Sequence, residues 1–174
     1  MKWVNHLAIA GATTALVNPV VVPVALPGST APDWLERVLK ALGRPVRYRT
    51  VTHYVLGWAL GLAFALGLWD FHGVLAAFAW GGLSHVLADS LTVMGVPFSP
   101  YSDRRFHLFG GRLRTGDMGE YFIAWGLVAV CVVAAMLFKP HSGGWYPFFP
   151  NWAGLYEDGV ADAKEWKDNR LKFF

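Results

Sequence analysis

The stretch Ser84-His85-Val86-Leu87-Ala88-Asp89-Ser90-Leu91-Thr92 lies near the end of a long apolar segment, residues 71–94. His85 and Asp89 are four residues apart, so on a helix they share one face. An ionisable pair in such a segment is costly and commonly faces a partner, a cavity or a metal. The two side chains can bind one divalent cation together, or they can simply hydrogen-bond each other or a neighbour. This stretch alone leaves both interpretations open.

The composition indicates an integral membrane protein of one domain. Of its 174 residues, 55% are hydrophobic and 16% are charged, whereas a soluble domain carries about 25% charged residues. Several uncharged apolar runs approach the length of a bilayer, and the nine tryptophans suit two interfacial belts. The net charge of +3 is small and falls in loops and tail. We interpret these charges as setting the orientation of the protein in the membrane and as contacting lipid headgroups. No nucleic acid partner is expected.

Three apolar segments predict three clear transmembrane helices in an all-α, multi-pass membrane protein. They are residues 52–69, 71–94 and 121–138, and the first two form an antiparallel hairpin through a tight link at Asp70. We divide the chain into a helical membrane domain, residues 1–139, and a C-terminal part, residues 140–174. That part has an aromatic stretch that we expect at the membrane interface, followed by a polar tail.

The first segment, residues 3–26, is predicted to be broken by proline. It lacks a signal-peptide layout, so we expect it to be retained. A helix over residues 4–17 would be only ~21 Å long, short of a ~30 Å hydrocarbon core. Pro19, Pro23 and Pro27 follow it and interrupt the helix pattern. The segment is either a kinked span or re-entrant, and we predict that it turns back and brings His6 close to His85.

The loops at residues 28–51 and 95–119 are predicted to be cytoplasmic. The hairpin puts them on one side of the membrane, and the link at Asp70 on the other side has no Lys or Arg. The positive-inside rule places the basic loops in the cytoplasm. Pro32, with Ser29 or Thr30 as a cap, also predicts a short helix over residues 33–42. The nine basic residues are Arg37, Lys40, Arg44, Arg47, Arg49, Arg104, Arg105, Arg112 and Arg114.

This topology brings polar residues from separate segments to one membrane face. His53 lies at the start of the apolar segment at residues 52–69, and His85 and Asp89 lie near the end of the segment at residues 71–94. Neutral imidazoles and carboxylates are the usual ligands of Zn or Mn, so the convergence favours a metal site. Each residue also has a simpler interpretation: His53 can cap a helix, and Asp33 can be a helix N-terminal charge. Likewise Arg49 and Arg114 can be basic residues that only follow the positive-inside rule. Glu120 can lie simply where the apolar segment at residues 121–138 meets water.

The motifs occur in an order that resembles a known family. They are Asn5-His6, Pro32-Asp33, Arg49-x-x-Thr52-His53, Ser84-His85-x-x-x-Asp89-x-x-Thr92-x-x-Gly95, and Arg114-Thr115-Gly116 with Glu120. Together they resemble the YdjM-type, LexA-regulated metal-dependent hydrolases of bacterial inner membranes, over about residues 3–125. The chain departs from the family pattern at Leu35, where a second acid often follows Pro-Asp. It departs again at Tyr48, where a His often precedes Arg49.

The resemblance implies a metal site and roles for its neighbours. The implied ligands of a divalent metal, Zn or alternatively Mn, are His6, Asp33, His53, His85 and Asp89. A metal held there would activate a water for attack on a phosphorus or carbonyl centre. Arg49 and Arg114 are expected to hold an anionic group, and Glu120 to act as general base or to orient a ligand.

Three classes of function are compared. The first is a membrane-embedded hydrolase of a phosphoester in a lipid or lipid-linked substrate at the cytoplasmic face of the bacterial inner membrane. The alternative is a non-enzymatic membrane subunit whose aromatic C-terminal region docks a protein partner. An ion pathway ranks last, because the middles of the apolar segments at residues 52–69 and 121–138 carry no charged residue.

Overall fold

The computed structural model describes residues 1–102, 104–138, 145–146 and 149–150. As predicted, the described chain is mostly helical. Its α-helices are α1 (Trp3–Val17), α2 (Val22–Ala41), α3 (Val55–Gly67), α4 (Val74–Ser90) and α5 (Met118–Phe138). Its short 3-10 helices are η1 (Pro19–Val21), η2 (Val51–His53) and η3 (Leu108–Gly110). Two-residue strands pair as β1 (Val96–Pro97) with β2 (Arg105–Phe106), and as β3 (Trp145–Tyr146) with β4 (Phe149–Pro150).

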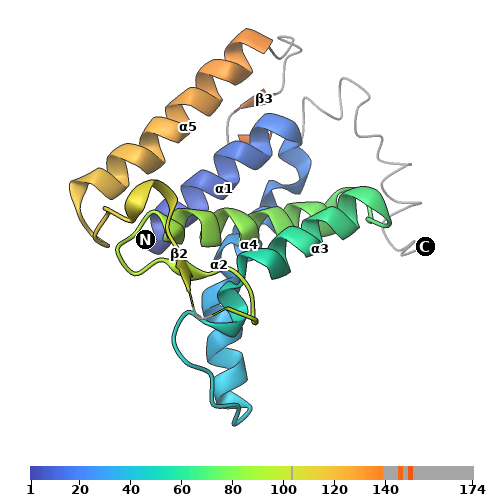
Figure 1. Ribbon diagram of the computed structural model, residues 1–174. Helices are drawn as coiled ribbons and strands as arrows, with labels where there is room; N and C mark the ends of the chain where they lie inside the picture. The colour runs from blue at the N-terminus through green and yellow to red at the C-terminus, as the bar shows by residue number, and fades with distance from the viewer. Residues whose placement is uncertain (103, 139–144, 147–148, 151–174) are drawn as a thin grey trace.

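Helix α4 occupies the centre of the helical assembly. It packs against α2, α3 and α1, while α5 lies along α1 (Figure 1). The α3–α4 pair forms the predicted antiparallel hairpin. Asp70 in the link between them accepts hydrogen bonds from the Leu75 and Ala76 amides at the start of α4, at 2.7 and 3.2 Å. Both charged oxygens therefore satisfy amides that lack a partner inside the helix.

The chain breaks after α1 at the predicted point. Asn18 has an extended backbone, with φ −146° and ψ 101°, and its Oδ1 accepts the Val20 amide at 3.0 Å. The next residue, Pro19, begins η1, and α2 then runs back along α1. The Trp3 indole donates to Asp33 of α2 at 2.6 Å, so the second helix does return to the side where α1 begins.

The prediction of a short helix over residues 33–42 was wrong. Helix α2 begins at Val22 and continues through Pro27 and Pro32 to Ala41. Proline lacks an N–H, so some carbonyls inside the helix lose their usual donor. Side chains donate to two carbonyls near Pro27: the Ser29 hydroxyl to Leu26 O at 2.7 Å, and the Trp34 indole to Pro27 O at 3.2 Å. Pro27 and Pro32 remove the donors of the Pro23 and Gly28 carbonyls, so these side-chain bonds do not replace the lost ones. Helix α2 instead continues past both prolines while packed along α4.

Two glycines set the close crossing of α2 and α4. A Cβ on Gly28 would lie 2.5 Å from the Phe78 carbonyl oxygen, and one on Gly81 would lie 2.7 Å from the Ser29 amide nitrogen. Because only hydrogen fits at both positions, the two helix backbones touch, as in the small-residue contacts of membrane helices. This contact holds Ser29 against α4.

We expect Gly81→Ala to separate α2 from α4 and to destabilise the protein. Overpacking of this kind costs about 1–3 kcal/mol, so the unfolding midpoint in detergent should fall by several degrees. Gly126→Ala on α5 is the control, because a Cβ there meets no atom within 4 Å among the described residues. Unchanged unfolding of Gly81→Ala would mean that the two helices do not cross at this distance.

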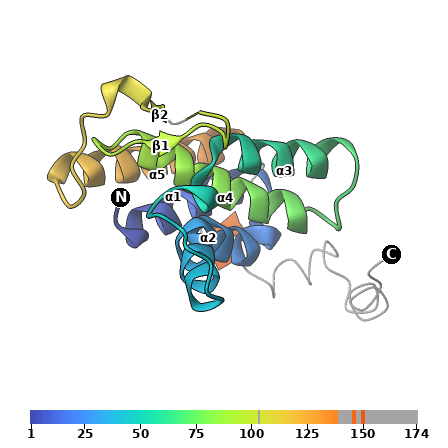
Figure 2. The ribbon, with the colours of Figure 1, turned by 60° about the horizontal axis from the view of Figure 1, so that its bottom comes forward.

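The loop at residues 95–119 contains a short β-hairpin among its described residues. β1 and β2 pair antiparallel with Val96 opposite Phe106. The hairpin lies over α4 on the side away from α2 (Figure 2). Val96 is buried with Val55 of α3 and Val86 of α4. The apolar contact of Val96 with both helices explains why the loop folds back over them.

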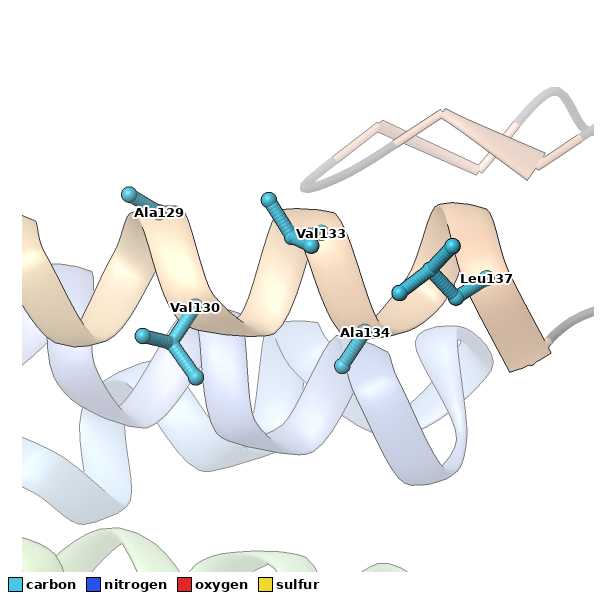
Figure 3. Close-up of a pocket in the computed structure, with 5 residues that line it drawn as sticks. All are labelled: Ala129, Val130, Val133, Ala134 and Leu137. Atoms are coloured by element: carbon cyan, nitrogen blue, oxygen red, sulfur yellow. The ribbon is translucent and has the colours of Figure 1, made fainter.

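Helix α5 has the length and composition of a membrane span. Residues Met118–Leu137 are the one stretch of the described chain that is long and apolar enough to cross a membrane. The apolar helices Trp3–Val17 and Val55–Gly67 are shorter. Much of α5 is exposed, and an open pocket of about 370 Å³ lies along it. Figure 3 draws the side chains that line this pocket. The pocket is lined by Ala129, Val130, Val133, Ala134 and Leu137.

Candidate metal centre

The first His and Asp group of the centre joins α1 to α4. The His6 and His85 rings stack with centroids 3.8 Å apart. Each ring places Nε2 at 3.4 Å from one carboxylate oxygen of Asp89, His6 from Oδ1 and His85 from Oδ2. The prediction that the first segment turns back and brings His6 to His85 is thus confirmed.

The second group joins α2 and η2 to the same His85. His53 Nε2 lies 3.4 Å from Asp33 Oδ1, and His85 Nε2 lies 3.8 Å from the same oxygen. The His53 and His85 rings meet edge to face, with centroids 5.4 Å apart. Five side chains from α1, α2, η2 and α4 therefore form one cluster around His85.

The cluster is buried, yet its imidazole Nε2 atoms have no hydrogen-bond partner. His6, His53, His85 and Asp89 are at most 1% exposed. Within the described residues, Nε2 of all three histidines makes no hydrogen bond. Buried polar atoms are rarely left unpaired, and an ion is one explanation when they are. The donor set is therefore chemically suited to a cation.

The hydrogen bond of His85 Nδ1 determines that Nε2 is the ring nitrogen free to bind an ion. His85 Nδ1 lies 2.6 Å from the Ser29 carbonyl oxygen, which can only accept a hydrogen bond. Nδ1 therefore carries the proton, and Nε2 presents its lone pair to the two carboxylates. His53 Nδ1 is held by the Thr52 hydroxyl at 3.0 Å. These contacts resemble the outer-shell bonds that orient metal-ligating histidines.

Both groups have dimensions that can hold a metal ion. In each, one ligand atom per residue lies within 4.8 Å of the others: His6, His85 and Asp89 in the first, and Asp33, His53 and His85 in the second. Because an imidazole nitrogen offers a single lone pair, His85 Nε2 can serve only one ion at a time. Two ions could not both use His85, and a single ion could draw on either group.

Positive groups surround Asp89. The Met1 amino group lies 2.5 Å from Oδ1, and Arg49 NH2 lies 2.9 Å from Oδ2. Arg49 is 6% exposed, and its Nε has no hydrogen-bond partner within the described residues. Arg49 was predicted near the site and lies in it. The contact of the Met1 amino group was missed, because a chain terminus carries no motif.

Glu36 was also missed, although it positions Arg49. It is 4% exposed, accepts the Arg49 amide at 2.9 Å and pairs with Lys40 at 2.6 Å. Arg49 has a positive φ of 51°, which is uncommon for a residue with a side chain. The bond from its amide to Glu36 helps to hold that conformation. In the sequence, Glu36 showed only an ordinary i,i+4 pair with Lys40.

Asp33 lies at the more accessible edge of the cluster. Its side chain is 19% exposed, whereas that of Asp89 is fully buried. Burial raises the pKa of Asp33, but the nearby His53 and His85 and the Trp3 indole outweigh this effect and lower the pKa to about 2. The carboxylate is therefore ionised at neutral pH, the form that binds a cation.

Glu120 and Arg114 lie apart from the cluster. Glu120 is fully buried, and its oxygens accept the Lys2 amide, the Asn5 amide group at 2.6 Å and the Gly116 amide at 2.7 Å. Among the described residues it has no hydrogen bond or ion pair with the five clustered side chains. Arg114 is exposed. Their predicted roles as general base and anion-binding group remain predictions.

The comparisons with known proteins identify a family. The model of the YdjM inner membrane protein family matches residues 1–146, which contain the whole cluster. No curated protein and no solved structure matches the chain. The match covers most of the chain, and agrees with the resemblance seen in the order of its motifs. The chain therefore belongs to the YdjM inner membrane protein family.

Proposed function

We propose that this protein is a membrane-embedded, metal-dependent hydrolase of the bacterial inner membrane, acting on a phosphoester in a lipid or lipid-linked substrate. The observation that carries the proposal is the buried cluster around His85, in which three histidine Nε2 atoms without hydrogen bonds face two carboxylates. A buried group of this kind is costly unless an ion or a chemical role accounts for it.

The proposed topology places the cluster at the cytoplasmic face. Of the described helices, α5 alone has the length and composition of a span. We propose that the shorter α3 and α4 cross the membrane as the predicted hairpin, and that α1 with the first part of α2 forms a re-entrant pair. The cluster lies where α1 begins and α4 ends, next to the basic loops. Under the positive-inside rule this end faces the cytoplasm, at headgroup depth.

The donor set suits Zn, and Mn as an alternative, because it combines imidazole nitrogens and carboxylates without thiolates. A divalent ion held there would act as a Lewis acid and lower the pKa of a bound water. His85, oriented by Ser29, and His53, oriented by Thr52, would present fixed lone pairs to it. Asp89, held between Arg49 and the Met1 amino group, keeps its carboxylate at the floor of the site.

Arg49 supports an anionic substrate. One of its nitrogens pairs with Asp89, and its buried Nε has no partner within the described residues. A guanidinium with a spare donor beside a metal can hold a phosphate oxygen in addition to the carboxylate. A phosphoester fits this arrangement better than a neutral ester does.

Metal analysis of the detergent-purified protein, together with a phosphate-release assay, tests the proposal. We expect about one equivalent of a divalent transition metal, the number that a single ligand group holds, and release of inorganic phosphate from phosphatidic acid in mixed micelles. Release should stop on chelation and resume when the metal is restored. Substoichiometric metal would refute the metal centre, and bound metal without release would refute this phosphoester as substrate.

The non-enzymatic alternative remains a prediction. Its docking region, residues 140–174, lies outside the described residues except at 145–146 and 149–150. The division of the chain at residue 139 and the protein partner also remain predictions.

A further inference from the structure

A second cavity lies in the helical assembly, at the end away from the metal centre. Its volume is about 610 Å³, and residues of α1, η1, α3, the α3–α4 link and α4 line it. This volume is in the range of ligand pockets. The walls include Leu62 and Leu66 of α3, and Ala76 and Trp80 of α4.

The polar groups around this cavity are mostly already satisfied. The Trp80 indole donates to the Thr13 hydroxyl at 2.8 Å, and that hydroxyl donates to the Ile9 carbonyl at 2.8 Å. The carboxylate oxygens of Asp70 and the side-chain oxygen of Asn18 accept hydrogen bonds from backbone amides. The Thr14 hydroxyl has no partner among the described residues, but Thr14 is only 5% exposed. The cavity therefore presents an apolar surface to an occupant.

The same two helices connect the cavity to the metal centre. On α1, Thr13 is seven residues beyond His6, a rise of ~10 Å. Along α4, Trp80 lies five residues before His85, a rise of ~8 Å. Gly73, just before the helix begins, lies twelve residues before His85, a rise of ~18 Å. The hydrocarbon of one leaflet is about half of a ~30 Å core. A chain anchored at the metal centre can thus reach the cavity.

We propose that this cavity binds the hydrocarbon chain of a lipid whose phosphate headgroup lies at the metal centre. The proposal rests on the proposed function and adds the apolar half of the substrate site. Leu66 is 74% exposed, so the α3 wall faces the surrounding lipid and offers a lateral way in. Trp80, fixed by its bond to Thr13, forms a rigid wall.

Photolabelling tests the proposal directly. The probe is phosphatidic acid with a diazirine in one acyl chain, incorporated with the full-length protein in mixed micelles. We expect labelled peptides from α3 and α4 around Leu62, Leu66 and Trp80. Ala76→Trp should fill the cavity and reduce this labelling at least tenfold, a free-energy change of about 1.4 kcal/mol. Leu62→Trp, from the opposite wall, should do the same.

Ala63→Trp is the matched control. Ala63 is the exposed neighbour of Leu62 on α3 and does not line the cavity, so labelling should stay at the wild-type level. Equal labelling in wild type, Ala76→Trp and Leu62→Trp would overturn the proposal. So would labelling that appears only after residues 151–174 are removed, because the chain's own C-terminal segment would then be the occupant.

Metal content separates this proposal from the proposed function. If the Trp variants keep the bound metal but lose phosphate release from long-chain phosphatidic acid, the chain site is supported. Retained release with cavity labelling unaffected by the Trp variants refutes the chain site and leaves the hydrolase standing. A wild-type protein without metal whose labelling still depends on Ala76 refutes the hydrolase and supports the lipid chain site alone.

Discussion

His85→Ala is expected to abolish metal binding. His85 Nε2 belongs to both groups of ligand atoms, so its removal leaves neither group complete. We expect the dissociation constant to rise at least ~100-fold, about 2.8 kcal/mol, as measured by metal competition in detergent. His72→Ala is the control, because His72 lies in the exposed α3–α4 link, outside the cluster.

Single replacements of the other two histidines show which group holds the ion. His6→Ala removes a ligand from the first group alone, and His53→Ala from the second alone. The larger loss of affinity identifies the group that binds. Stoichiometric metal that survives His85→Ala would contradict the metal centre, and the cluster would then be a hydrogen-bonded structural core.

Glu120→Gln is expected to destabilise the protein while leaving metal binding intact. The carboxylate of Glu120 accepts three N–H groups that join the start of α1 to the loop before α5. A glutamine amide cannot accept at both positions, and it removes the charge. Bonds to charged groups are worth about 1.5–3 kcal/mol each, so we expect a loss of about 2–4 kcal/mol in unfolding free energy.

The assay also separates a structural from a catalytic role for Glu120. Asp117→Asn, at an exposed position three residues earlier, is the control and should leave the unfolding midpoint unchanged. If Glu120→Gln instead keeps wild-type stability and loses phosphate release, Glu120 acts as the general base, and the structural interpretation fails.

Local patterns were sufficient for several parts of the fold. The i,i+4 spacing put His85 and Asp89 on one face of α4, and Asn18 followed by Pro19 ended α1 at the predicted residue. The hairpin around Asp70 followed from two apolar runs with a short link. These features depend on residues close together in the chain, where helical periodicity and proline act directly.

Contacts between distant segments overrode local patterns elsewhere. Pro27 predicted an interruption and Pro32 the start of a short helix, but α2 runs through both because its close packing on α4 stabilises it. Glu36 looked like a surface acid, but it is buried and holds the amide of Arg49. Val96 looked like part of an irregular loop, but the β1–β2 hairpin buries it against α3 and α4.

The sequence by itself determined the helical membrane class and the types of residue in the cluster, because hydropathy and donor chemistry are properties of single residues and short spacings. Only the tertiary structure decided that His85 is shared by two groups, that Glu120 stands apart from them, and that Glu36 and the Met1 amino group belong to the surroundings. Those facts depend on how α1, α2 and α4 cross. The crossing is set by glycine contacts and buried hydrogen bonds between residues that are more than 50 positions apart, such as Ser29 and His85.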